Sequence, residues 1–102
     1  MTVYALVELE ITNLEAMGPY LAGVAGTIAA HGGKYLVQAG VEDLAGNAEI
    51  VEGELGAFPV KVVLEFPSMA AGKGWYNSEE YQAILPFRRA NANGRMIWLK
   101  GV

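Results

Sequence analysis

Residues Val62 to Arg88 read VVLEFPSMAAGKGWYNSEEYQAILPFR, and this segment carries the strongest indication of the fold. It begins as an apolar strand rich in valine and leucine, which is typical of a strand buried in a sheet. The chain leaves that strand through Phe66-Pro67-Ser68, and Ser68 and Ser78 are each placed to cap a short helix. The segment therefore predicts one strand followed by a helix broken in two.

The remaining elements are read outward from this segment. Thr12 and Glu15 have the spacing of a capping box, so a helix is expected from there to His31-Gly32-Gly33. Pro19 and its glycine neighbour predict a kink or restart of that helix near Gly18. Asn93-Gly94 is expected to close the last helix. Alternation and β-branched content predict four strands, over residues 2–11, 34–38, 58–66 and 95–99.

The predicted order is βαββαβ, which is the ferredoxin-like arrangement of the α+β class. We expect a four-stranded antiparallel sheet with helices on one face. Two right-handed crossovers place the first and third strands side by side in the centre, and we expect these two to run parallel. The other face of the sheet must meet water or a partner.

Alternation along the strands assigns residues to the two faces. The face toward the helices is expected to carry Val3, Val7, Val60, Val62, Leu64, Phe66, Ile97 and Leu99. The open face is expected to carry Tyr4, Leu6, Glu8, Lys61, Val63, Glu65, Met96, Trp98 and Lys100. This mixture of apolar and charged residues favours two sheets packed face to face across a homodimer, with Trp98 as an interface anchor.

The region from Ala39 to Ala57 is rich in glycine and net acidic. It is expected to form a long hairpin connection, with a short extra strand near Glu49 to Glu52 as one alternative.

Length and composition agree with a single domain over residues 1–102 that has a partner. Hydrophobic residues make up 53% of the chain and charged residues only 18%, which is more apolar than an average soluble domain. A second copy of the chain covering the open sheet face is the simplest explanation, so a homodimer is expected.

Charge and residue content exclude several classes of function. A net charge of −4 with 7 Lys plus Arg argues against nucleic-acid binding, which needs a basic surface. The absence of cysteine excludes disulfides and thiolate chemistry, and no ligand spacing predicts a metal or cofactor. The N-terminus reads as a strand, without a signal peptide or membrane span, so a cytoplasmic protein is expected.

Four blocks of sequence resemble a known family: HGGKYLV (31–37), LEFPS (64–68), WYNSEEY (75–81) and FRR (87–89). In this order they are similar to the family numbered 1330 among the domains of unknown function. The resemblance covers nearly the whole chain and implies the dimeric α+β barrel form of the ferredoxin-like fold. No reaction is established for that family, so the resemblance implies no mechanism.

The chain departs from the family pattern in three places. Residues 41–48 look like an insertion in the hairpin, and Gly72 and Gly74 loosen the helix before Trp75. Gln38 stands where a basic residue is usual, so an anionic ligand accepted by relatives is expected to bind less well here.

Two charged residues in the opening segment are candidates for function. Glu65, in an apolar strand, is either a catalytic carboxylate or the partner of a cation such as Lys61. Arg88 either clamps a carboxylate ligand with its guanidinium or caps helix carbonyls. Lys61 is a second candidate for orienting an anionic ligand.

The other candidates also have two interpretations. His31, the single histidine, is either a general acid or base or a residue that caps a helix. The aromatic residues Tyr35, Trp75, Tyr76 and Tyr81 either line a pocket for a small molecule or fill the core.

Two hypotheses follow. The first is a small-molecule protein in which a barrel encloses a polar or anionic ligand and Glu65 or His31 moves a proton. The second is a non-catalytic structural or binding dimer without a small-molecule substrate.

Overall fold

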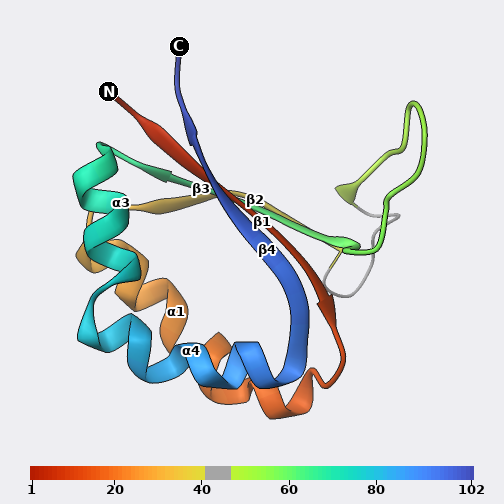
Figure 1. Cartoon of the computed structure of the whole chain (residues 1–102), viewed down its shortest axis with the longest axis horizontal. Helices are drawn as coiled ribbons and strands as arrows, with labels where there is room; N and C mark the ends of the chain where they lie inside the picture. The colour runs from red at the N-terminus through yellow and green to blue at the C-terminus, as the bar shows by residue number, and fades with distance from the viewer. Residues whose placement is uncertain (41–46) are drawn as a thin grey trace.

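The four strands of the protein form one sheet with all helices on one side, as the computed structural model shows (Figure 1). The structure describes residues 1–40 and 47–102. The strands are β1 (Val3–Ile11), β2 (Lys34–Ala39), β3 (Val60–Phe66) and β4 (Ala92–Lys100). The helices are η1 (Glu15–Met17), α1 (Gly18–Ala30), α3 (Met69–Tyr76) and α4 (Glu79–Asn91).

The sheet has the strand order β2-β3-β1-β4, and each neighbouring pair is antiparallel. This confirms the predicted α+β class and the four-stranded antiparallel sheet. The expected parallel pairing of the first and third strands is wrong. Each crossover returns the chain parallel to its starting strand, and the connection from β2 then reverses direction, so β3 runs opposite to β1.

Serine caps begin two of the helices, as predicted. The hydroxyl of Ser68 accepts a hydrogen bond from the amide of Ala71 at 3.1 Å. Ser78 does the same for the amide of Tyr81 at 3.2 Å. These bonds satisfy amides that have no partner within the helix, which fixes where α3 and α4 begin.

The other predicted helix ends differ from the structure. The restart at Gly18 is confirmed, because η1 ends at Met17 and α1 begins there. The Thr12 capping box is wrong, since Asn13 accepts the hydrogen bond from the amide of Ala16 instead. Asn93-Gly94 lies inside β4 and closes no helix, because α4 passes directly into extended backbone at Ala92.

The face assignment of β4 was one residue out of register. Ala5 pairs with Trp98, so Trp98 lies on the helix side of the sheet, while Ile97 pairs with Leu6 on the open side. Each set on β4 combines apolar side chains with a charged one, Lys100 on the helix side and Arg95 on the open side, so alternation alone did not distinguish them. Trp98 is therefore no open-face anchor, and its ring packs 5.8 Å from Phe66 and 6.4 Å from Trp75, centroid to centroid.

Residues 47–59 contain no strand, so the expected short strand at Glu49 to Glu52 is wrong. Part of the suspected insertion, residues 41–46, lies outside the described residues. Among the residues that are described, no helix is long and apolar enough to cross a membrane.

A substitution at Gly33 would test how tightly α1 packs on β3. A Cβ at Gly33 would collide with the ring of Phe66, which is fully buried, and would lie 2.8 Å from Cγ2 of Ile28. Gly33→Ala is therefore expected to lower the free energy of unfolding by about 1–3 kcal/mol, measured by urea denaturation.

Gly26→Ala is the control for this substitution, because a Cβ there meets no atom within 4 Å. It lies inside α1, where alanine is the better helix former, so a gain of up to about 1 kcal/mol is expected. Equal effects of the two substitutions would contradict the packing described here.

Candidate functional site

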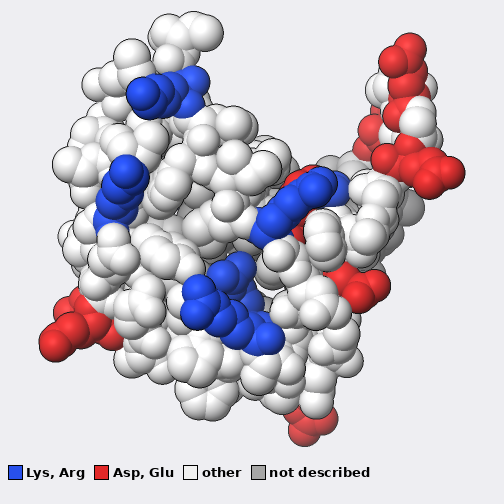
Figure 2. All heavy atoms as spheres, in the orientation of Figure 1, with Lys and Arg blue, Asp and Glu red and all other residues white. Residues whose placement is uncertain are grey.

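A cavity of about 310 Å³ opens between α4 and β4. Figure 2 shows that Lys and Arg side chains gather around a hollow on this face of the molecule. The cavity is lined by Leu9, Tyr76, Arg88, Arg89, Ala92, Gly94, Arg95, Met96 and Trp98. It therefore joins three arginines to an apolar wall.

The cavity arises where α4 joins β4 without a loop. Asn91 ends the helix, Ala92 begins the strand, and the two elements diverge from that point (Figure 1). The backbone amide of Thr12 donates to the carbonyl of Asn91 at 2.8 Å and holds the junction against the end of β1. Gly94 is required close by, because a Cβ there would collide with the carbonyl oxygen of Glu8.

Arg88 is the buried cation of this cavity. Its side chain lines the cavity, yet the residue is only 8% exposed. Within the described residues it forms no ion pair, and its buried Nε has no hydrogen-bond partner. The guanidinium carbon lies 5.8 Å from the centre of the Tyr20 ring. A ring face compensates a cation only partly, so Arg88 retains positive charge that no carboxylate among the described residues neutralises.

The two tyrosines beneath Arg88 do not supply that negative charge. The hydroxyls of Tyr20 and Tyr81 are 2.9 Å apart, and both residues are buried. Burial raises the pKa of both hydroxyls above their ordinary value, although the charge of Arg88 acts in the opposite direction. Both phenols are therefore neutral at physiological pH.

Arg89 and Tyr76 form the rim of the cavity. Nη2 of Arg89 donates a hydrogen bond to the hydroxyl oxygen of Tyr76 at 2.9 Å. The hydroxyl hydrogen of Tyr76 then remains available to donate to a ligand.

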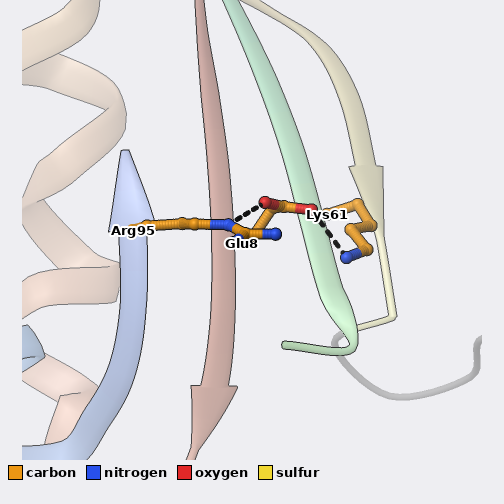
Figure 3. A network of polar contacts seen from close by, with 3 residues as sticks. All are labelled: Glu8, Lys61 and Arg95. Carbon is orange, nitrogen blue, oxygen red and sulfur yellow. Dashed lines mark hydrogen bonds and ion pairs between the residues drawn. The ribbon is translucent and has the colours of Figure 1, made fainter. Parts of the chain in front are cut away.

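Arg95 belongs to both the cavity and an ion-pair network on the open face (Figure 3). Its Nε lies 2.5 Å from Oε2 of Glu8, and Nζ of Lys61 lies 2.7 Å from Oε1 of the same carboxylate. The hydrogen bond from Arg95, followed by that from Lys61, holds the pKa of Glu8 below its usual range. Two cations thus share one carboxylate, and the network has a net charge of +1.

The other predicted ligand residues lie apart from this cavity. Trp75 and Tyr81 are fully buried, and Nε1 of Trp75 donates to the hydroxyl of Thr27 at 3.0 Å. Tyr35 and Trp75 line a second, apolar cavity of about 70 Å³ between α1 and the sheet, as does Gln38. Lys61 lies on the open face with Glu8. Of the predicted ligand residues, only Arg88 lines the larger cavity.

The two predicted catalytic residues also lie elsewhere. Glu65 pairs with Lys34 on the open face, with 3.2 Å between Oε2 and Nζ, and not with Lys61. His31 caps the C-terminus of α1, where its backbone amide donates to Ile28. Neither residue lines the larger cavity, and the structure brings the two together in no described site.

Arg89 and Arg95 were missed as site residues, whereas Tyr76, one of the aromatic residues expected to line a pocket or fill the core, does line the cavity. A signal was present in the sequence, because all three arginines of the chain fall between residues 88 and 95. The described residues hold no group of three or more His, Cys, Asp or Glu side chains suited to a metal ion.

Glu8 makes stability depend on pH. Because its pKa is lower in the folded chain than the ordinary value of 4.5, the network stabilises the fold above that pH and loses its effect as the pH falls below it. Glu8→Gln is therefore expected to lower stability by about 1–2 kcal/mol at pH 7 and by less at pH 3, measured by urea denaturation. Glu10→Gln, on the same face of β1, is the control. A difference from wild type that does not change with pH would contradict this account.

Two solved structures share the fold. One is the crystal structure of RPA0582, a protein of unknown function from Rhodopseudomonas palustris, with a TM-score of 0.77 and 19% identity over 99% of this chain and 82% of that one. The other is the crystal structure of the methylated RPA0582 protein, with a TM-score of 0.76 and 19% identity over 99% of this chain and 81% of that one. At this identity the likeness shows the fold alone. No curated protein matches the chain.

The family comparison agrees with the three-dimensional one. The sequence model described as "Domain of unknown function (DUF1330)" matches residues 2–102, which include every strand and helix of the sheet and its cover. The chain therefore belongs to the DUF1330 family.

Proposed function

We propose that this protein binds a small organic anion in the cavity between α4 and β4. The observation that carries the proposal is Arg88, which is 8% exposed and lacks an anionic partner among the described residues. A cation buried without a partner is destabilising, so proteins retain one mainly where a ligand completes it. Arg89 and Arg95 add positive charge at the same cavity.

The proposal is one of binding, with acid or base chemistry as a weaker extension. Glu65 and His31, the candidates for moving a proton, lie outside the cavity, and Glu65 has its own cation in Lys34. Tyr76 is the lining residue that carries an exchangeable neutral proton. A cytoplasmic location, to which the absence of cysteine is suited, belongs to the same proposal.

The second part of the proposal is a homodimer through the open sheet face, the dimeric α+β barrel. An apolar row crosses all four strands on that face, formed by Val37, Val63, Leu6 and Ile97. Val37 and Ile97 are each 43% exposed although no described helix packs on this side. A second sheet would bury the row as in a sandwich.

The alternative is a structural dimer with no small-molecule substrate. The observation in its favour is that the charged groups beside the apolar row already satisfy one another, in the pairs of Glu8 with Lys61 and Arg95 and of Glu65 with Lys34. The charge of Arg88, which has no ion-pair partner among the described residues, favours the binding hypothesis over this one.

Arg88→Met tests the ligand. Methionine keeps the apolar stem and removes the buried charge, so the variant is expected to be as stable as wild type or more stable when no ligand is present. Thermal shift against a panel of small organic acids should raise the melting temperature of wild type and leave that of Arg88→Met unchanged. The control is Lys73→Met, at an exposed position on α3. Equal shifts for wild type and Arg88→Met would remove Arg88 from the site.

Ile97→Glu tests the dimer. A carboxylate in the centre of the apolar row would be buried against its own copy, so light scattering at micromolar concentration should show a dimer for wild type and a monomer for the variant. Phe87→Glu is the matched control, because Phe87 is 42% exposed but lies on α4. A monomeric wild type would reject the paired-sheet arrangement.

A further inference from the structure

We infer that the anion held at Arg88 is a monocarboxylate with an apolar body, and not a phosphate ester; the inference rests on the proposed function. Three features of the cavity carry it: the helix ends that line it, the donors that are free, and the apolar wall.

Both helices that line the cavity present their C-terminal ends. Tyr76 is the last residue of α3, and Arg88 and Arg89 lie in the last turn of α4. Helix C-termini carry partial negative charge, which opposes a dianion and is offset here by the arginines. Many phosphate sites in proteins use the opposite arrangement, with helix N-termini or runs of backbone amides pointing at the ligand. The caps Ser68 and Ser78, which mark the N-termini of α3 and α4, do not line the cavity.

The donors of Arg88, the lining arginine whose side chain makes no hydrogen bond among the described residues, suit one carboxylate. Nε of Arg88 is shut off from solvent, so its two Nη groups remain for a ligand and form a parallel pair that matches the two oxygens of a carboxylate. Nε of Arg95 is already bonded to Glu8, and Nη2 of Arg89 to Tyr76. The hydroxyl of Tyr76, oriented by Arg89, supplies one further hydrogen bond to the same carboxylate.

The opposite wall suits an apolar body. Leu9 of β1 and Met96 and Trp98 of β4 line it. The Trp98 ring is held in place by its edge-on packing against Phe66 and Trp75. Flat aromatic and flexible thioether groups together accept a ring or a branched chain. A volume of about 310 Å³ is at the small end of ligand pockets, so the body is about the size of one ring.

Four probes separate these features: three of similar size, benzoate, phenyl phosphate and benzamide, and the smaller acetate. Calorimetric titration of the full chain should show benzoate binding most tightly. Phenyl phosphate should bind at least roughly tenfold more weakly, because the helix C-termini oppose its second negative charge. Benzamide lacks the charge and acetate lacks the ring, so each of them should also bind at least roughly tenfold more weakly than benzoate. In ¹H–¹⁵N spectra the indole signal of Trp98 should move with benzoate while that of the buried Trp75 moves less.

Two variants test the roles of individual donors. Arg88→Lys keeps the charge but loses the paired donors, so benzoate should bind at least roughly tenfold more weakly. Tyr76→Phe removes one hydrogen bond, so a loss of roughly threefold to tenfold is expected. Thermal unfolding without ligand reports whether each variant is folded, and Lys73→Met is the control for both.

The outcomes distinguish this inference from the proposed function. Tighter binding of phenyl phosphate than benzoate, with dependence on Arg88, would overturn the carboxylate inference and leave anion binding in place. Equal binding of benzoate and acetate would overturn the apolar body alone. Failure of both aromatic anions to bind at millimolar concentration would overturn both.

Discussion

The pairing of β1 with strands on both sides is the constraint on which the rest of the structure depends. One side of β1, formed by Val3, Ala5, Val7 and Leu9, is buried beneath the helices. The other side carries Glu8, whose carboxylate binds Lys61 of β3 and Arg95 of β4 and so ties three neighbouring strands in one register (Figure 3). A slip of one residue would exchange these two sides, burying Glu8 and exposing the core. The cavity inherits this register, because Leu9 and Met96 line it from paired strands.

The sequence predicted correctly those parts of the fold in which the residue pattern allows a single interpretation. In β1 the inward residues are small or apolar and Glu8 and Glu10 lie outward, and the caps Ser68 and Ser78 stand directly before their helices. β4 carries apolar residues and a charged residue on each face, so its register could be known only from its partner strand. Thr12 and Asn13 are both residue types that cap helices, and the side chain of Asn13 is the one that accepts a hydrogen bond from the amide of Ala16. The backbone amide of Thr12 binds the carbonyl of Asn91.

The candidate site was less predictable because it depends on distant contacts. Arg88 was predicted as a ligand residue because it is a cation that follows a run of aromatic residues, and it does line the cavity. Arg88 is buried without an anionic partner among the described residues. This follows from the packing of α4 on α1, which places the Tyr20 ring beneath the guanidinium. Glu65 was predicted as a candidate because it is a charge in an apolar strand. Its cation, Lys34, lies on β2, the edge strand at the opposite end of the sheet from β4. In this chain the isolated charge in a strand has an ion-pair partner, whereas the clustered arginines at the end of α4 line the cavity.

Because α4 ends at Asn91 and β4 begins at Ala92, the two walls of the cavity are joined directly by a peptide bond. No loop residues lie at this junction, so a change in the angle between helix and strand would have to occur in the backbone of Asn91 and Ala92. Substitutions along the two walls would change how deep a molecule enters but not how wide the entrance stands. Under the proposed binding function, discrimination between ligands would therefore depend on their thickness near the junction. Relatives with a longer connection at this point would be expected to accept bulkier ligands.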